Sequence, residues 1–188
     1  VATVNATGLV TAIATGAAQV IATEAGGKAD TVDVTVTTLP PPPPLPATRF
    51  SEIHYDNGGT DTGEAIEIEG PAGTDLTGWS IVLYDGNGGG AYGTTALTGI
   101  IANSCSGRGV VVVNYPTNGI QNGAPDGFAL VNSAGSVVEF LSYEGSFTAT
   151  SGVAAGLVST NIGVSEVGNE AAGQSLQRDP SGVWQPVA

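Results

Sequence analysis

Apolar and polar residues alternate over short stretches of this chain, and the alternation predicts β-strands. In Ala65–Glu69, with the sequence AIEIE, Ile66 and Ile68 fall on one face and Glu67 and Glu69 on the other. That pattern is typical of an antiparallel strand with one buried face. No window of about 11 residues places apolar residues at helical spacing between credible caps. The chain is therefore predicted to be all-β.

The strands predicted after residue 47 recur at short intervals, separated by turns rich in Gly, Asp, Thr and Asn. They are expected at Phe50–Tyr55, Ala65–Glu69, Gly78–Tyr84, Thr95–Ile101, Gly109–Asn114, Phe128–Asn132 and Val137–Tyr143. Such spacing favours a β-sandwich. Period-2 placement predicts one core between the two sheets, formed by Leu76, Trp79, Ile81, Leu83, Ile66, Ile68, Phe128, Leu130, Val138 and Phe140.

The first 39 residues form a separate region with four short β segments: VATVN, LVTAIATG, AAQVIATEA and KADTVDVTVTT. Four strands without a partner sheet bury too little apolar surface to be stable alone. We expect either a poorly ordered stub or a unit that pairs with the following domain or with a neighbouring chain. Residues 40–46, PPPPPLP, predict an extended polyproline II spacer. The expected organisation is thus 1–39, 40–46 and 47–188.

Composition adds a strong negative charge. Seventeen acidic residues against four basic ones give a net charge of −13. Such a surface repels phosphates, and Lys28, Arg49, Arg108 and Arg178 are too scattered in the sequence to form a basic patch, so direct binding of nucleic acid is not expected. No apolar run approaches the roughly 18 residues of a membrane span. The single cysteine allows no disulfide within these residues.

Two stretches resemble known families. The run Val4-Asn5-Ala6-Thr7-Gly8-Leu9-Val10-Thr11-Ala12 and its spacing to Gly26-Gly27 resemble the second half of a bacterial immunoglobulin-like domain of group 2. Residues 47–188 resemble the bacterial lamin-tail family at SEI (51–53), IEI (66–68), DLTGW (75–79) and DGFALV (126–131). The second resemblance implies an immunoglobulin-like β-sandwich and carries over no catalytic residue.

The resemblance also implies a setting. The stretches IQNGAPDG (120–127), FLSYEGSFTAT (140–150) and GQSLQR (173–178) resemble members of that family found beside secreted nuclease and phosphoesterase domains. We therefore expect a non-catalytic accessory module of a larger bacterial protein, secreted or at the cell surface. Its expected partners are the other domains of that protein. The chain begins with Val1 inside a strand-like pattern and contains no methionine, so we expect an excised piece of a longer protein. The alternative is an adhesion or assembly module that binds protein or glycan through strand edges and loops.

The loop after the first strand of the second region holds the candidate metal ligands. Asp56, Asn57, Asp61 and Glu64 lie on the glycine-rich stretch YDNGGTDTGE, and oxygen ligands on a flexible loop suit calcium. The spacing does not match the twelve-residue calcium loop of helix-loop-helix proteins. The competing interpretation is a solvated turn in which Asp and Asn cap their own backbone.

Catalytic interpretations find little support. Glu52, His54 and Asp56 share one strand face, but a hydrolytic zinc site needs three convergent ligands and the chain has one histidine and no paired cysteines, so a polar histidine at a strand edge is expected. Glu52 and Glu67 could form a carboxylate pair for glycoside hydrolysis, which also needs an aromatic-lined cleft. GGGAYG, residues 88–93, has the letters of a nucleotide fingerprint without a helix after it. No Ser-His-Asp arrangement is indicated.

Cys105 lies in the turn-rich stretch NSCSGRG and is expected at the surface. By resemblance to related sequences with a second cysteine further along, we expect it to form a disulfide with a residue outside this chain. The alternative is a buried, small apolar residue.

Overall fold

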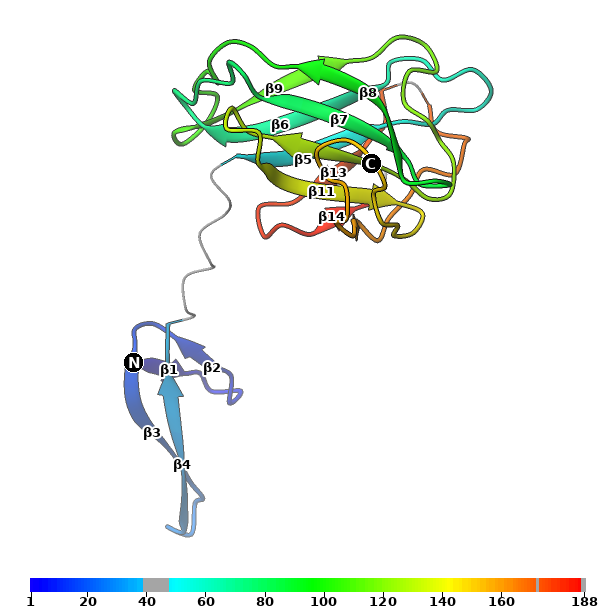
Figure 1. Cartoon of the computed structure of the whole chain (residues 1–188). Helices are drawn as coiled ribbons and strands as arrows, with labels where there is room; N and C mark the ends of the chain where they lie inside the picture. Colours follow the sequence, from blue (N-terminus) through cyan, green and yellow to red (C-terminus); the bar gives the residue numbers. More distant parts are fainter. Residues whose placement is uncertain (39–47, 172, 187–188) are drawn as a thin grey trace. The chain divides into compact units, whose positions relative to one another are not determined.

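The computed structural model of the protein describes residues 1–38, 48–171 and 173–186 (Figure 1). All of its regular elements are β-strands, which confirms the all-β prediction. The chain divides into two compact units, Val1–Pro43 and Pro44–Ala188. The predicted proline spacer, residues 40–46, lies outside the described residues. Within those residues no helix has the length and hydropathy that crossing a membrane would require.

The first unit consists of two antiparallel pairs. Strand β1 (Ala2–Val4) pairs with β2 (Val10–Ala12), and β3 (Gly16–Thr23) pairs with β4 (Ala29–Val36). The β3–β4 turn contains Gly27 at φ = +80°, a conformation that suits glycine. Every described residue of this unit is exposed or half-buried. The unit therefore has no closed core of its own, and the partner that we expect for it stays a prediction.

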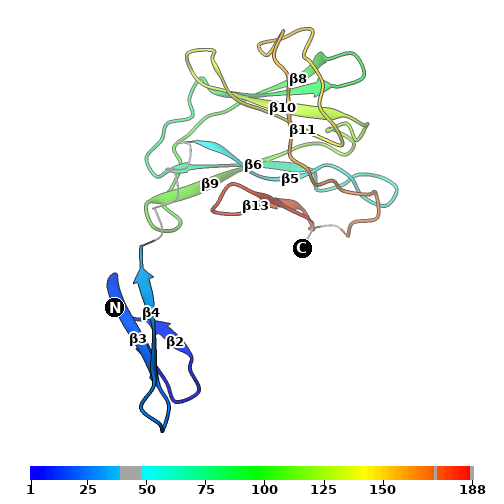
Figure 2. The same cartoon turned by 90° about the horizontal axis from the view of Figure 1, so that it is seen from below.

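The second unit is a β-sandwich of two five-stranded sheets (Figure 2). The first sheet has the order β14-β13-β5-β6-β9, with bounds Trp184–Gln185, Leu176–Arg178, Arg49–His54, Ala65–Pro71 and Arg108–Asn114. The second sheet has the order β12-β11-β10-β7-β8, with bounds Thr160–Asn161, Val137–Tyr143, Asp126–Val131, Ser80–Asp85 and Gly90–Ala96. The two packed sheets agree with the predicted immunoglobulin-like sandwich.

The main core lies between the sheets and follows from the period-2 pattern. Ile66 and Ile68 on β6 are fully buried against Phe50 and Phe128, whose ring centroids are 4.5 Å apart. Burial of each such side chain contributes roughly 1.5–3 kcal/mol. The predicted members found in this core are Ile66, Ile68, Leu76, Ile81, Leu83, Phe128 and Leu130, and Trp79 is half-buried beside it.

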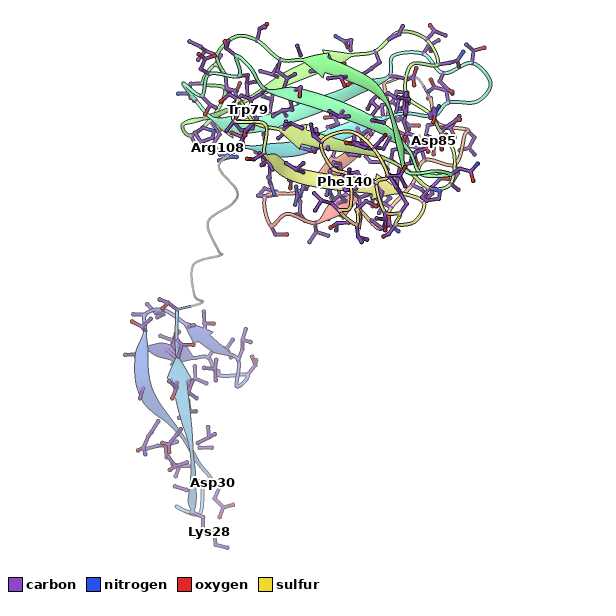
Figure 3. All side chains as sticks on the ribbon, in the orientation of Figure 1. Lys28, Asp30, Trp79, Asp85, Arg108 and Phe140 are labelled. Atoms are coloured by element: carbon purple, nitrogen blue, oxygen red, sulfur yellow. The ribbon has the colours of Figure 1, made fainter. Side chains whose placement is uncertain are left out.

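Two predicted core residues on β11 were wrong. Phe140 pairs with Ala129 and lies in a second cluster with Tyr84 and Phe147 (Figure 3 labels Phe140), and Val138 is 37% exposed. The core residue Phe128 lies directly opposite Leu141 in the β10–β11 register, so Leu141 and Tyr143 occupy the main core instead.

The predicted strand Thr95–Ile101 was also wrong. Strand β8 runs earlier, over Gly90–Ala96, and shares only Thr95 and Ala96 with the predicted range. Two backbone hydrogen bonds explain the exit from the sheet: Leu76 N–H donates to Gly99 C=O over 2.8 Å, and Ile101 N–H donates to Thr74 C=O over 2.9 Å. These bonds attach residues 99–101 to the turn before β7 in place of the sheet.

Candidate functional site

Glu64, one of the four candidate calcium ligands, is fully buried and holds a different segment of the chain. Its Oε2 accepts a hydrogen bond from Gly119 N–H and its Oε1 one from Ile120 N–H, each over 2.8 Å. Burial raises the pKa of Glu64, and the two backbone donors oppose that rise. Both carboxylate oxygens therefore fix the segment between β9 and β10.

The other three candidates form a network that includes their own loop and Asn122. Asp61 Oδ1 accepts from Asn57 N–H over 2.8 Å, and Asn57 Oδ1 accepts from Thr62 N–H over 2.7 Å. The amide Nδ2 of Asn122 donates to Asp56 Oδ1 and to Asp61 Oδ2, each over 3.2 Å. The structure thus brings Asp56 and Asp61 together around Asn122, and it directs Glu64 elsewhere.

This arrangement resembles the expected turn that caps its own backbone more than a converging set of ligands. Among the residues that the structure describes, no group of three or more His, Cys, Asp and Glu side chains is placed to hold a metal ion. Calcium binding at Asp56, Asn57, Asp61 and Glu64 stays a hypothesis for experiment.

His54 lies at the end of β5 and is only 4% exposed. Its Nδ1 lies 2.8 Å from Glu166 Oε1, and its Nε2 lies 3.0 Å from Asn57 Nδ2. Glu166 Oε2 also accepts from the backbone N–H groups of Tyr55 and Asp56, each over 2.7 Å. The polar histidine expected at a strand edge is instead a buried residue on the central strand β5, and the segment that carries Glu166 covers it.

The electrostatics of this pair follow from burial and contact. Burial lowers the pKa of His54, but the hydrogen bond that His54 Nδ1–H donates to Glu166, the charge of that carboxylate and the contact with Asn57 outweigh it, so the pKa is raised. Burial raises the pKa of Glu166, against the opposing effects of His54 and two backbone donors. Sequence reasoning missed Glu166, because no local pattern links it to a strand that begins more than 100 residues earlier.

The outer face of the first sheet carries the predicted carboxylate pair. Glu52 and Glu67 lie opposite each other in the β5–β6 register. Ser175 Oγ donates to Glu52 over 2.6 Å, and Ser51 Oγ donates to Glu67 over 2.7 Å. Burial raises the pKa of Glu67, and the charges of Glu52 and Glu69 add to the rise. The two carboxylates are therefore neighbours, each held by a serine.

Arginines that are far apart in the sequence meet at one end of this face. Arg49 and Arg108 both pair with Glu69, through opposite oxygens of its carboxylate, and Arg178 lines the same hollow. Arg178 Nη1 pairs with Glu139 over 2.7 Å. Sequence separation had suggested scattered charges. The sheet instead gathers all three arginines of the unit, and each has an acidic partner, which Arg49 and Arg108 share.

Two shallow hollows follow the outer face, with volumes of ≈ 190 Å³ and ≈ 320 Å³. Glu52 and Glu67 line both of them. Val112 lines the smaller hollow and Val110 the larger, and these two β9 valines are 52% and 43% exposed. The outer face of the first sheet therefore offers mixed polar and apolar contacts beside β9. Its described lining includes no aromatic side chain of the kind that glycoside hydrolysis would favour.

The remaining sequence candidates have structural positions. The glycines of GGGAYG form the β7–β8 turn and the start of β8; at Gly89 an added Cβ would lie 2.2 Å from the Thr148 carbonyl oxygen, so close backbone approach explains that glycine. Cys105 is exposed and unpaired among the described residues, as expected for its turn. Its disulfide with a residue outside the chain stays a prediction.

Comparisons with known proteins leave the family open. No protein-family model, curated protein or solved structure matches the chain. The fold is established by the geometry, and the lamin-tail and bacterial immunoglobulin-like resemblances remain hypotheses carried by their motifs.

Proposed function

We propose that the chain is a non-catalytic β-sandwich module that positions or docks a larger bacterial protein, secreted or at the cell surface. The observation that carries the proposal is the engagement of the His54–Glu166 pair, the arrangement most similar to a catalytic dyad. Both ring nitrogens of His54 and both carboxylate oxygens of Glu166 have protein partners. A general base needs a nitrogen or oxygen within reach of a substrate proton. Here those atoms hold the loops.

The parent protein is proposed to be a nuclease or phosphoesterase whose catalytic domain lies outside these residues. The motif resemblance supports this setting. The charge of −13 fits it as well, because a module this acidic does not compete with a catalytic domain for a phosphate-rich substrate.

The test is a hydrolysis assay of the chain itself. Double-stranded DNA and bis(p-nitrophenyl) phosphate are offered with Mg²⁺, Ca²⁺, Mn²⁺ or Zn²⁺, and His54→Gln and Glu166→Gln serve as matched variants. We expect no turnover above buffer from any of the three proteins. Turnover by the wild type that either variant abolishes would contradict a non-catalytic role.

A second candidate function is an adhesion or assembly module that binds a protein or glycan at the cell surface. The exposed valines of β9 beside the two hollows favour it. The two functions differ in one measurable respect. The experiment is to delete residues 48–186 from the parent protein. If the module positions the parent protein, the deletion changes where the enzymatic activity is retained. If the module is an adhesin, the deletion changes how the cell attaches.

A further inference from the structure

The sandwich has four sheet edges, and three of them carry features that block pairing with another strand. Strands β12 and β14 are two residues long. Strand β8 has a register shift against β7, and Ser151 Oγ accepts from its Ala91 N–H over 2.9 Å. Short strands, bulges and covering loops are the devices by which natural sheets protect their edges.

Strand β9 has none of these devices beyond its first residue, Arg108, whose N–H and C=O bond to the turn at Ser104 and Cys105. It extends over seven residues, Arg108–Asn114, in unbroken register with β6. Its interior, Gly109–Val113, contains four consecutive valines and no charged residue or proline. A long, straight, apolar edge is a template for an added strand.

The backbone groups on the open side of β9 can be assigned. Tyr115 N–H donates to Glu64 C=O over 2.9 Å, and these residues are directly opposite in the β6–β9 register. Hydrogen-bonded and non-hydrogen-bonded pairs alternate along an antiparallel ladder, so Val113 and Val111 bond to β6. Val110, Val112 and Asn114 then direct their N–H and C=O groups away from β6. No hydrogen bond to these groups occurs within the described residues.

Side-chain exposure agrees with an uncovered edge. Val111 and Val113 point toward the core yet remain half-buried, although inward residues of the central strands β5 and β6 are fully buried. Val110 and Val112 are exposed on the outer face. An added strand would cover apolar side chains on both faces of the sheet.

We propose that β9 binds an extended strand of another protein by β-augmentation, with main-chain hydrogen bonds to Val110, Val112 and Asn114. The inference rests on the proposed docking function and names its interface. The partner strand carries apolar side chains beside the β9 valines and basic or neutral ones elsewhere, because Glu52 and Glu67 line the smaller hollow beside Val112 with no arginine or lysine in its described lining. A second copy of this chain fits less well, since each copy carries a charge of −13.

The test is selection of binders from a displayed library of random dodecapeptides against the folded chain. The variant Val112→Pro removes an outward N–H and leaves the predicted bonds to β6 in place. Val112→Lys adds a charge at the same position, and Val138→Lys, on the exposed face of β11, is the matched control. Circular dichroism and thermal melting establish that each variant is folded.

We expect enriched peptides that are apolar at alternate positions, with affinity reduced by about tenfold or more in both Val112 variants and within about twofold of wild type in Val138→Lys. The proposal would be overturned if the wild type enriched no peptides beyond those that Val112→Lys enriches. It would also be overturned if the peptides bound equally to the wild type and to both Val112 variants. A concentration-dependent dimer that Val112→Lys abolishes would assign the edge to a second copy and overturn the heterologous partner. The hydrolysis assay answers separately whether the module is catalytic, so failure of the edge proposal is distinguishable from failure of the proposed function.

Discussion

His54 Nδ1 and Glu166 Oε1 lie 2.8 Å apart although 112 positions separate the two residues in the sequence. Both side chains are nearly excluded from solvent. Because Glu166 also accepts the backbone N–H groups that follow β5, the pair ties the segment between β12 and β13 to the end of a central strand. This contact explains how the residues around Glu166 acquire a fixed position beside a strand that is distant in the sequence.

The first prediction concerns pH. The pKa of His54 is raised in the folded protein above its ordinary 6.5, so the folded state binds this proton more tightly than the unfolded state. The contribution to stability is then fully present below pH 6.5 and is lost as pH rises through the folded pKa. We expect the free energy of unfolding of the wild type, minus that of His54→Gln, to decrease above pH 6.5, by at most about 1.4 kcal/mol per pH unit. Urea unfolding of both proteins from acid to mildly alkaline pH measures it; a difference that is flat or rises with pH would contradict the direction.

The second prediction ranks positions of the core. Phe128 is fully buried between the sheets, so Phe128→Ala should cost about 3–5 kcal/mol. Trp79 is only half-buried, so Trp79→Ala should lower the free energy of unfolding by less, about 2 kcal/mol. Alternation alone would rank Trp79 with Phe128. Val138→Ala, on an exposed side chain, should cost about 0.5 kcal/mol. Denaturant unfolding gives the order, and an equal loss for Val138 and Phe128 would contradict the assignment of faces on β11.

The third prediction concerns Glu64. Its two carboxylate oxygens accept hydrogen bonds from two backbone N–H groups in a buried site. In Glu64→Gln one of these backbone N–H groups faces the side-chain N–H₂, which cannot accept a hydrogen bond. We expect a loss of about 1–3 kcal/mol in the free energy of unfolding. Asp75→Asn is the control: Asp75 accepts a backbone hydrogen bond at an exposed turn. Equal losses in both variants would argue against a special role for Glu64.

The fourth prediction concerns calcium. The oxygens of Glu64 and Asp61 already accept protein hydrogen bonds, so we expect millimolar calcium to leave the melting temperature unchanged. Thermal melting of wild type and Asp61→Ala with and without calcium measures the effect. A rise that Asp61→Ala abolishes would support the loop as a calcium site.

Local alternation was sufficient to predict much of the fold. Ile66 and Ile68 were assigned to the buried face because Glu67 and Glu69 fixed the other one. The same rule failed on β11, where VVEFLSY has apolar residues on both faces. There the pairing of Leu141 with Phe128 and the loop that carries Phe147 determine which residues are covered, and neither can be deduced from the strand itself.

The candidate site was harder to predict, because its contacts join distant segments. Asp56, Asn57, Asp61 and Glu64 were identified from their spacing on one loop, yet their partners include Asn122, Gly119 and Ile120. The Arg49–Glu69–Arg108 group depends on the pairing of β5 with β6 and of β6 with β9. Strand order supplies these neighbours, and the sequence pattern does not specify strand order.

The most direct measurement of the docking account is amide hydrogen exchange along β9 in the free protein, followed residue by residue by NMR. If the edge is open, Val110 and Val112 exchange rapidly while Val111 and Val113, bonded to β6, are protected, so that protection alternates along the strand. Equal protection of all four valine amides would mean that β9 is covered, and it would contradict the account.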